Sequence, residues 1–500
     1  MNDLKNKNMN QYIISLDEGT SSCRAVLFNS DAEIVDIIQQ EFTQYFPKPG
    51  WVEHDPIEIW EKQLSVMKQI IADNQIDAKN IAAIGITNQR ETTVVWDKQT
   101  GKSIYNAIVW QDKRTTGVCN QLKKDQWEPV IRAKTGLVID AYFSATKVQW
   151  ILENVDGARD LAEKGDLLFG TIDTWLIWKL TNAKVHATDC SNASRTMLFN
   201  IETLEWDEEL LEAFNVPESM LPEVKDSNAY FGDFEIDGVK IPITGVIGDQ
   251  QAALFGQTAW NKGQAKNTYG TGCFLLLNTG AEKVQSQSGL LSTIAWKKDD
   301  QLIYALEGSV FIAGAAIQWL RDGLEIIESA SETENLALST SDDELVVVPA
   351  FSGLGAPYWD MNARGAIFGI TQGSGKAELV KATLQSLALQ SYDLLTAMQN
   401  DSGIKMQNLQ VDGGAIANDF LAQFQADILD LTVERPMNLE STATGAAYMA
   451  ALGVNLWSEE YIQSRRESEF VFNPKMSSEK RKHHLVSWSK AIERSRGWLE

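Results

Sequence analysis

The spacing of apolar and polar residues predicts two kinds of element, strands joined by turns and helices with one apolar face. Both kinds recur in the second half of the chain. Near the start, apolar residues fill 12–17, turn-forming residues fill 18–22, and apolar runs return at 24–28 and 34–38. Short apolar runs bounded by glycine, serine and other turn formers are typical of β-strands. The start of the chain is therefore predicted to form strands joined by tight turns.

A helix is predicted next. Asp55 can cap it, and Pro56 suits its first turn. Apolar residues then recur on one helical face, at Trp60, Leu64, Met67 and Ile71. Residues 81–86 form a continuous apolar run of strand length. Strands that alternate with helices in this way indicate an α/β fold.

The second half opens like the first. Residues 265–269 indicate an extended segment, Gly270-Thr271-Gly272 a turn, and residues 273–277 another strand. This partial duplication places one glycine–threonine hairpin in each half of the chain.

A chain of 500 residues is too long for one hydrophobic core, so two lobes are expected. Further strands are predicted at 345–351 and 409–411, each before a glycine-containing loop, and a long helix at 377–398. A boundary near residue 257 divides the chain into an N-terminal lobe, 1–257, and a C-terminal lobe, 258–500.

Composition excludes several classes of protein. The formal net charge of −24 repels the phosphates of nucleic acids and the head groups of anionic membranes. The polar N-terminus lacks the apolar segment of a secretory signal, and no apolar stretch approaches the ~18 residues of a membrane span. The four cysteines are too scattered for a zinc site or a disulfide framework. A cytoplasmic enzyme that acts on a small molecule is expected.

The two hairpin turns carry the first candidate chemistry. Gly19 and Gly270 let backbone amides approach an anion, while Thr20, Ser21 and Thr271 add hydroxyl donors. A phosphate group needs several donors that converge from one side. Either turn alone is more often a plain β-hairpin, whereas one turn in each lobe favours a phosphate site.

These turns and the later Asp412-Gly413-Gly414 resemble the duplicated actin-like ATPase (ribonuclease H-like) fold of hexokinase, actin and the sugar kinases. The resemblance implies an α/β protein of two lobes with an interlobe cleft. It also implies that the first hairpin faces the nucleotide phosphates and that Asp17 lies near a magnesium ion, which prefers hard oxygen ligands.

Asp249 is the candidate catalytic base. It stands between the apolar run 243–247 and a predicted helix. There it can either cap that helix or accept a proton from a hydroxyl that attacks a phosphate. The residues alone leave both interpretations open. The histidines offer no better candidate, because their surroundings favour structural or surface roles; they are His54, His186, His483 and His484.

Arg90 and Glu91 are the candidate polyol-binding pair. They follow the apolar run 81–86, and ligand contacts favour the carboxyl ends of buried strands. One guanidinium donor and one carboxylate acceptor suit hydroxyl groups, which both donate and accept, although such a pair is usually a solvated loop pair. Trp110 and Phe274 are either core aromatics or walls for the carbon face of a small polyol.

The chain also resembles, nearly end to end, the carbohydrate-kinase family, whose members phosphorylate glycerol, xylulose, ribulose and gluconate. The stretches that carry this resemblance are 47–56, 85–93, 170–178, 192–196, 248–256 and 267–274, with family signatures at 142–150 and 365–385. Within the family, the substrate indicated is glycerol, on the basis of Arg90, Glu91, Trp110, Tyr142 and Asp249.

Carried over residue by residue, the resemblance implies three groups of contacts. Glycerol would be held by Arg90, Glu91, Trp110, Tyr142, Asp249, Gln250 and Phe274. The phosphates would be held by Thr20, Ser21, Ser22, Arg24 and Thr271, and the rest of the nucleotide by Gly314, Gln318, Gly414 and Asn418. The reaction would transfer the γ-phosphoryl group of ATP, with Mg²⁺, to a terminal hydroxyl, giving sn-glycerol 3-phosphate and ADP. Because family members often form dimers or tetramers, a homo-oligomer is expected.

Two departures from the family pattern change what is expected of the chain. Glu18 follows Asp17 where the family commonly has glutamine, and a carboxylate that faced the phosphates would repel them. Glu18 is therefore expected to turn away or to approach the metal. Residues 230–241 contain neither the histidine that activates some bacterial relatives nor the glycine-arginine loop that binds fructose 1,6-bisphosphate in others, so both controls are expected to be absent.

Two alternatives remain on the sequence alone. One is a sibling kinase for another polyol or sugar, and the other is an actin-like nucleotide-binding sensor without transferase activity. A sensor has no need of Asp249 beside a polyol-binding set. ATP-dependent phosphorylation of glycerol, with Asp249 as the general base, is therefore the predicted activity.

Overall fold

A computed structural model describes residues 11–437, 440–465 and 468–499, and its chain divides into two compact units. The first unit comprises 1–258, 292–304 and 441–466, and the second 259–291, 305–440 and 467–500. The sequence predicted one boundary near residue 257, whereas two later segments of the chain return to the first unit.

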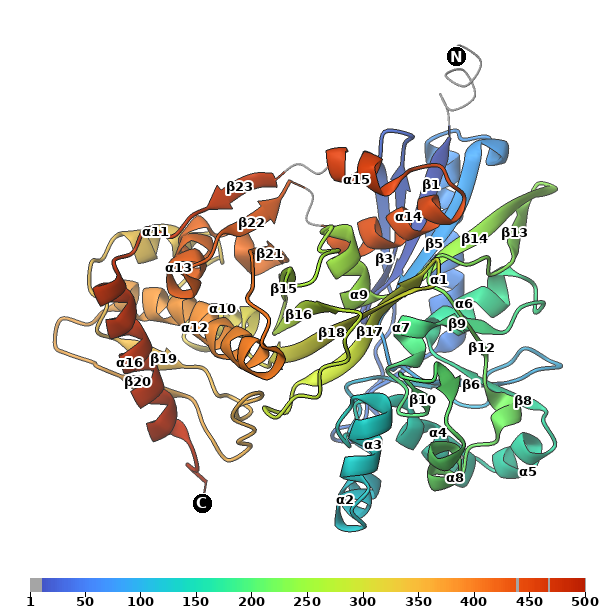
Figure 1. The fold of residues 1–500 in the computed structure, drawn as a ribbon, viewed down its shortest axis with the longest axis horizontal. Helices are drawn as coiled ribbons and strands as arrows, with labels where there is room; N and C mark the ends of the chain where they lie inside the picture. Colours follow the sequence, from blue (N-terminus) through green and yellow to red (C-terminus); the bar gives the residue numbers. More distant parts are fainter. Residues whose placement is uncertain (1–10, 438–439, 466–467, 500) are drawn as a thin grey trace. The chain divides into compact units, whose positions relative to one another are not determined.

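A six-stranded sheet forms the centre of the first unit (Figure 1). Its strands, in order, are β13 (Asp233–Ile236), β14 (Val239–Gly248), β5 (Ile81–Asn88), β1 (Tyr12–Glu18), β2 (Ser22–Phe28) and β3 (Ile34–Glu41). β1 pairs with β2 antiparallel and with β5 parallel, and β14 runs parallel to β5. The β1–β2 turn and the residues that follow β5 and β14 therefore lie at the same end of the sheet.

Helices cover both faces of this sheet. α1 (Pro56–Asp73) packs on the face that carries Leu16. α14 (Ser441–Gly453) packs on the other face, where a Cβ at Gly85 would lie 2.4 Å from the carbonyl oxygen of Ala446. Only glycine permits this approach, which explains why a late segment belongs to the first unit. Figure 1 shows α14, in red, beside the blue strands.

Smaller elements surround this sheet. The helices are α2 (Thr116–Lys124), α3 (Glu128–Thr135), α4 (Ser144–Asn154), α5 (Ala158–Glu163), α6 (Ile172–Leu180), α7 (Cys190–Ala193), α8 (Glu208–Phe214), α9 (Asp249–Gly256) and α15 (Glu459–Arg465). The short strands are β4 (Glu53–His54), β6 (Val94–Asp97), β7 (Ala107–Ile108), β8 (Leu167–Gly170), β9 (Ala187–Asp189), β10 (Phe199–Asn200), β11 (Glu205–Trp206) and β12 (Glu223–Lys225).

A second sheet repeats the pairings of the first. Its strands, in order, are β17 (Leu291–Lys298), β18 (Gln301–Val310), β16 (Cys273–Gly280), β15 (Ala265–Tyr269), β21 (Leu409–Asp412), β22 (Val433–Pro436) and β23 (Ser468–Phe472). β15 pairs antiparallel with β16 and parallel with β21, as β1 does with β2 and β5. β22 runs parallel to β21 and antiparallel to β23, as β14 does to β5 and β13. The predicted duplicated α/β fold is confirmed.

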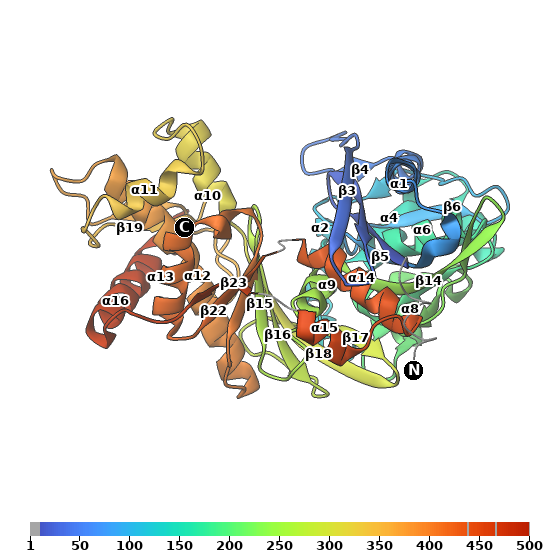
Figure 2. The ribbon, with the colours of Figure 1, turned by 90° about the horizontal axis from the view of Figure 1, so that it is seen from above.

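Helices of the second unit pack around its sheet. They are α10 (Gly314–Gln318), α11 (Glu332–Leu338), α12 (Lys376–Ser402), α13 (Asp419–Leu429) and α16 (Ser478–Ser495), of which α12, α13 and α16 lie side by side in Figure 2. The predicted long helix is confirmed as α12. The strand predicted at 345–351 is reduced to β19 (Val346–Val348), paired with β20 (Ala366–Phe368), because Pro349 ends it without an N–H to donate.

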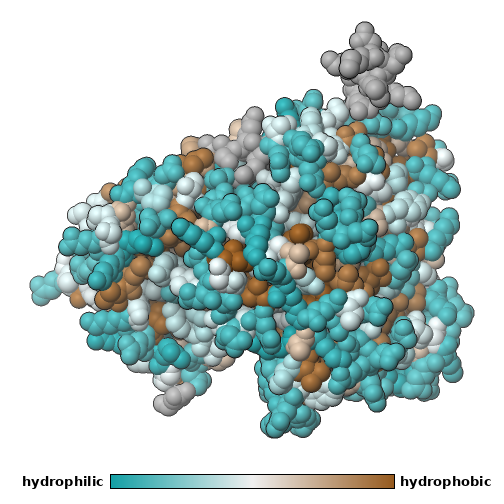
Figure 3. Space-filling model, viewed as in Figure 1, coloured by the Kyte–Doolittle hydropathy of each residue, from teal (hydrophilic) through white to brown (hydrophobic). Residues whose placement is uncertain are grey.

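The surface and the cysteines agree with the composition. Figure 3 shows hydrophilic residues over most of the face in view. In the described ranges, no helix is long and apolar enough to cross a membrane. All four cysteines are buried and none forms a disulfide.

Candidate active site

Charged side chains gather where the strands of the first unit end. Arg90 and Glu91 follow β5, and Asp249 begins α9 directly after β14. The Arg90 Nε atom lies 3.0 Å from Asp249 Oδ1 and 3.9 Å from Glu91 Oε1. Arg90 and Glu91 are almost fully buried, whereas 29% of the Asp249 side chain is exposed. The fold thus brings these three predicted residues together and leaves Asp249 the most accessible of them.

Asp249 does not occupy the capping position of α9. The N-cap is Gly248, and Asp249 is the first helical residue. Its Oδ1 atom accepts a bond of 2.6 Å from the backbone N–H of Gln250 in addition to the contact with Arg90. The interpretation of Asp249 as the helix cap is therefore wrong, and its partner across the site is a buried guanidinium group.

The backbone before Asp249 is fixed by a small residue and a hydroxyl. A Cβ at Gly248 would lie 2.9 Å from both Cγ and Cδ of Arg90, so only glycine lets that side chain pass. The N–H of Gly248 donates to Ser191 Oγ at 2.9 Å, and Ser191 Oγ donates to Asp189 at 2.9 Å. These contacts set the position from which Asp249 projects.

Two aromatic side chains form a corner beside Arg90. The rings of Trp110 and Tyr142 are 5.6 Å apart and inclined by 78°. Arg90 Nη2 donates to Tyr142 Oη at 3.4 Å, and Trp110 Nε1 donates to Thr20 Oγ1 at 3.0 Å. The predicted polyol-binding residues of this unit therefore adjoin the first hairpin.

The first hairpin carries an acidic and a basic side chain opposite each other. Asp17 and Arg24 are paired across β1 and β2, with Arg24 Nη2 3.3 Å from Asp17 Oδ2. The turn between the strands is closed by a bond of 2.9 Å from the N–H of Gly19 to the carbonyl of Ser22. Ser21 is exposed, and Thr20 is half-buried. The predicted phosphate donors of this unit thus surround one turn.

Glu18 turns inward from this hairpin, which was one of the two expected placements. Its side chain is fully buried, and Gln89 Nε2 donates to both carboxyl oxygens at 3.2 Å. Burial raises the pKa of the Glu18 carboxyl well above its usual range.

The two histidines of the first unit make structural contacts. His54 faces Gln44 at 3.1 Å, and His186 faces the carbonyl of Phe169 at 2.8 Å. Burial lowers the pKa of each imidazole to about 4, so both are neutral near pH 7. Neither histidine touches Asp249 through these contacts.

The second unit gathers backbone groups where the first gathers charges. The N–H of Gly314 donates to the carbonyl of Gly270 at 3.0 Å, and the N–H of Ala313 donates to the carbonyl of Thr271 at 2.9 Å. A Cβ at Gly413, whose φ is +92°, would lie 2.5 Å from the carbonyl oxygen of Tyr269. The second hairpin, the start of α10 and the 413–414 turn therefore meet at one end of β15 and β21.

The remaining predicted nucleotide residues lie close to that meeting point. Asn418 caps α13, because its Oδ1 accepts from the N–H of Leu421 at 3.0 Å, and its Nδ2 donates to Thr333 at 3.1 Å. Gln318 is exposed at the end of α10, and Gly414 is exposed as well. Phe274 is half-buried on β16 in this unit, opposite Thr268.

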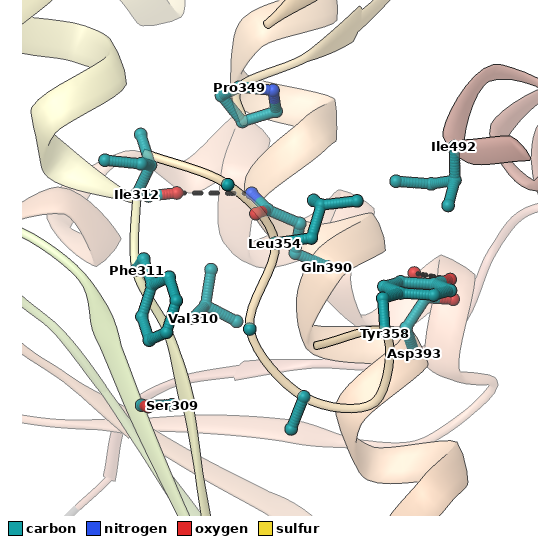
Figure 4. Close-up of a pocket in the computed structure, with 13 residues that line it drawn as sticks. Ser309, Val310, Phe311, Ile312, Pro349, Leu354, Tyr358, Gln390, Asp393 and Ile492 are labelled. Carbon is teal, nitrogen blue, oxygen red and sulfur yellow. Dashed lines mark hydrogen bonds between the residues drawn. The ribbon is translucent and has the colours of Figure 1, made fainter. Parts of the chain in front are cut away.

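A cavity of about 20 Å³, the size of one water molecule, lies beside the loop that leads into α10 (Figure 4). Gln390 donates to the carbonyl of Ile312 in this loop at 3.2 Å. Asp393 accepts from Tyr358 Oη at 2.7 Å and from Trp488 Nε1 at 2.6 Å. Burial raises the pKa of Asp393 to about 6. Helix α12 therefore anchors both this loop and α16.

Several residues of the first-unit site were not predicted. Arg195 Nε donates to Glu91 Oε1 at 2.6 Å, and Gln251 Oε1 accepts from Arg90 Nη1 at 3.1 Å. Lys147 is fully buried and donates to the carbonyls of Tyr142 and Phe143. One signal was available for Arg195, since it is a lone charged residue within the small polar stretch 192–196.

This architecture is that of a two-domain carbohydrate kinase. The chain belongs to the FGGY family of carbohydrate kinases, whose N-terminal domain matches residues 12–256 and whose C-terminal domain matches residues 265–454.

Within the family, its similar relatives are glycerol kinases. The glycerol kinase of Carboxydothermus hydrogenoformans is 58% identical over 498 residues, which cover 98% of this chain and 99% of that protein. That of Caldanaerobacter subterraneus is 59% identical over 496 residues, 98% of this chain and all of that protein. Among solved structures, Plasmodium falciparum glycerol kinase with ADP has a TM-score of 0.92 at 38% identity, covering 97% of this chain and 98% of that one.

Proposed function

We propose that this protein transfers the γ-phosphoryl group of ATP to a terminal hydroxyl of glycerol, giving sn-glycerol 3-phosphate and ADP. The observation that carries the proposal is the 58% identity, over 98% of the chain, to the glycerol kinase of Carboxydothermus hydrogenoformans. The site geometry of the first unit supports it, because a buried donor, a buried acceptor and an accessible carboxylate lie together there.

The polar pair suits the hydroxyls of glycerol. Arg90 donates and Glu91 accepts, while Trp110 and Tyr142 offer apolar ring surface to the carbon chain. A site that fixes a hydroxyl in this way also orients it toward the phosphate it attacks, which lowers the entropic part of the barrier.

Asp249 accepts the proton of the attacking hydroxyl. Because Arg90 and Gln250 both contact Oδ1, we assign the proton to Oδ2. As the glycerol oxygen forms its bond to the γ-phosphorus, the bond from that phosphorus to the bridging oxygen of ADP breaks, and the hydroxyl proton passes to Asp249. The proton is afterwards released to solvent.

The second unit supplies the residues that we assign to the nucleotide. Thr271, Gly314, Gly414 and Asn418 lie where backbone groups and a helix cap meet, which suits a ligand bound through many neutral contacts. Thr20, Ser21, Ser22 and Arg24 supply donors for the phosphates.

A magnesium ion bound with ATP would neutralise charge on its phosphates. In the described ranges, no three His, Cys, Asp or Glu side chains gather as a ready-made metal site. Asp17 fits a site in which one carboxylate shares the ion with water and phosphate oxygens, which is the usual mode for Mg²⁺. Asp17 is buried beside Arg24, so its carboxylate is held in place before the ion arrives.

Two further parts of the proposal concern assembly and location. We expect a homodimer or homotetramer, which light scattering of the purified protein measures directly. We also place the enzyme in the cytoplasm, where ATP is supplied and where its buried cysteine thiols stay reduced.

A substrate panel tests the proposal. ADP release is measured with glycerol, xylulose, gluconate and erythritol, each at several concentrations. The highest kcat/KM is expected for glycerol, and phosphorus NMR should show sn-glycerol 3-phosphate. A higher kcat/KM for another polyol or sugar would make the protein a sibling kinase. Nucleotide binding without ADP release on any substrate would favour the sensor.

A further inference from the structure

Arg195 is a buried guanidinium group with no part in the proposed mechanism. It follows α7, its side chain is fully buried, and its Nε donates to Glu91 Oε1 at 2.6 Å. Arginine stays protonated in proteins, so this is a permanent charge inside the first unit. Burying such a charge is unfavourable unless a partner compensates it, and the partner is a residue of the polyol-binding pair.

Glu91 lies between two guanidinium groups. Its Oε1 atom is 2.6 Å from Arg195 Nε and 3.9 Å from Arg90 Nε. The Glu91 side chain is only 1% exposed, so solvent contributes little to keeping it ionised. Its backbone is also constrained, because φ is +61° and its carbonyl accepts from Ser144 Oγ at 3.0 Å. Both the backbone of Glu91 and its carboxylate are therefore fixed in position.

The charge balance of the site depends on Arg195. Glu91 and Asp249 are the two carboxylates, and Arg90 contacts both of them. Arg195 is the closer partner of Glu91, which leaves Arg90 closest to Asp249. Without Arg195, Arg90 alone would have to compensate both carboxylates, and it would be drawn from Asp249 toward the more deeply buried Glu91.

Arg195 also contacts two aromatic rings, and one of them, Tyr142, belongs to the site. Its Cζ atom lies 5.7 Å from the ring of Tyr142 and 5.3 Å from that of Phe143. Cation–π contacts of this kind favour a fixed guanidinium plane. A side chain that contacts Glu91 and Tyr142 together can set the distance between the polar and the apolar part of a substrate pocket.

We propose that Arg195 is a positioning residue for glycerol phosphorylation: it fixes the Glu91 carboxylate as the acceptor of one substrate hydroxyl and thereby sets the discrimination between glycerol and diols that lack that hydroxyl. The inference rests on the proposed function. A site built to hydrogen-bond a hydroxyl rejects the analogue without it, because its own polar group is then left unpaired. When Glu91 is loosened, that rejection weakens.

The test compares three substrates with three variants. Propane-1,2-diol and propane-1,3-diol each lack one hydroxyl of glycerol, so at least one of them lacks the group that Glu91 contacts. The variants are Arg195→Met, Arg195→Lys and the control Arg114→Lys. Arg114 is an equally buried guanidinium of the same unit, paired with Glu53 at 2.7 Å and Asp112 at 2.8 Å. The readouts are KM, kcat and the melting temperature.

Arg195→Met should raise KM for glycerol roughly 10- to 100-fold, the factor expected for a lost hydrogen bond to a charged group. The preference for glycerol over at least one diol should narrow about 10-fold or more. Arg195→Lys keeps the charge but not the planar fork, so it should recover part of both values. Arg114→Lys should lower the melting temperature and leave the preference unchanged. If Arg195→Met does not fold, Arg195→Lys must still narrow the preference.

A double-mutant cycle tests whether Arg195 acts through Glu91. In a Glu91→Gln background, Arg195→Met should add less than about 3-fold to KM, because the residue through which it acts is already neutral. Multiplicative effects of the two changes would overturn the proposal. An unchanged substrate preference in both Arg195 variants of an active enzyme would also overturn it. A wild type that fails to phosphorylate glycerol would instead overturn the proposed function.

Discussion

The two sheets share their strand pairings but carry different chemistry where their strands end. At β1, β5 and β14 of the first unit the chain places charged side chains, namely Asp17, Arg90, Glu91 and Asp249. At β15 and β21 of the second unit it places the small residues Gly270, Thr271, Gly413 and Gly414, and the charged residue there is the buried Asp412 at the end of β21. The same strand pairing thus supports a cluster of charged side chains at the strand ends of the first unit and a cluster of backbone amides at those of the second.

The hairpins show the difference position by position. Asp17 pairs with Arg24 across the first hairpin, and the corresponding pair in the second hairpin is Thr268 with Phe274. The strand pairing is the same, so backbone geometry does not decide which unit carries charge. Side chains at the strand ends decide it, and they suit proton and hydroxyl handling in the first unit and neutral nucleotide contacts in the second.

The largest effect on activity is expected when the charged cluster of the first unit loses its accessible carboxylate, Asp249. Asp249→Asn keeps the size of the side chain but not its basicity, so kcat for glycerol phosphorylation should fall by about 10²–10⁴. Glycerol binding should be partly retained, because Arg90 and Glu91 remain although Asp249 is itself a predicted glycerol contact. Steady-state kinetics and calorimetric titration with glycerol measure the two quantities. A near wild-type kcat would remove Asp249 from the mechanism.

The strand-end site of the second unit should be disrupted by a substitution that its backbone cannot accommodate. Gly413→Ala places a Cβ 2.5 Å from the Tyr269 carbonyl at a φ of +92°, which should cost about 3 kcal/mol of unfolding free energy. Gly414→Ala is the matched control, since a Cβ there meets nothing within 4 Å. It should leave the free energy of unfolding within ~0.5 kcal/mol and raise only the KM for ATP. Urea unfolding compares the two, and equal losses would refute the assignment of the clash.

In the second unit, the Asp393 carboxylate holds elements of the fold together. The pKa of Asp393 is about 6 in the folded chain, above its ordinary ~3.9. Between these values only the folded state keeps the proton, so the unfolding free energy should fall by about 2 kcal/mol as pH rises from 4 to 6. Asp393→Asn keeps an acceptor for Tyr358 and Trp488 and should abolish this fall. Urea unfolding of both proteins at pH 4 and pH 7.5 measures it; parallel pH profiles would contradict it.

The smallest effect should come from two helix caps, one taken from each unit. Asp55 caps α1 and Asn418 caps α13 through side-chain oxygens. Alanine at either position should cost about 1 kcal/mol of unfolding free energy. Only Asn418→Ala should also raise the KM for ATP, because only that cap is assigned to the nucleotide. Equal KM values in the two variants would take Asn418 out of the nucleotide site.

The local sequence pattern was sufficient to predict those elements whose ends carry clear capping or turn residues. Asp55-Pro56 marked the start of α1, and the glycine–threonine turns marked both central hairpins. It could not place α14 in the first unit, because the glycines that admit it are ordinary strand residues until the helix is seen against them. The three-residue length of β19 depends on Pro349, which a periodicity argument overlooks.

The meeting of Arg90, Glu91 and Asp249 could be predicted, whereas the residues that support them could not. Arg90, Glu91 and Asp249 follow strands that the pattern located, so their meeting could be expected from sheet topology. Arg195 and Ser191 come from α7 and the residues after it, and a short helix of small polar residues gives no sign of which strand end it faces. Such contacts are set by tertiary packing, which spacing along the chain does not encode.

Hydrogen exchange of the wild-type protein tests most directly whether glycerol binds to the first unit and ADP to the second. Amide exchange is measured by mass spectrometry without ligand, with saturating glycerol, and with saturating ADP. Glycerol should slow exchange at 88–93 and 248–253 in the first unit, whereas ADP should slow it at 269–273 and 413–418 in the second. Protection of 413–418 by glycerol, or of 88–93 but not 413–418 by ADP, would contradict the account.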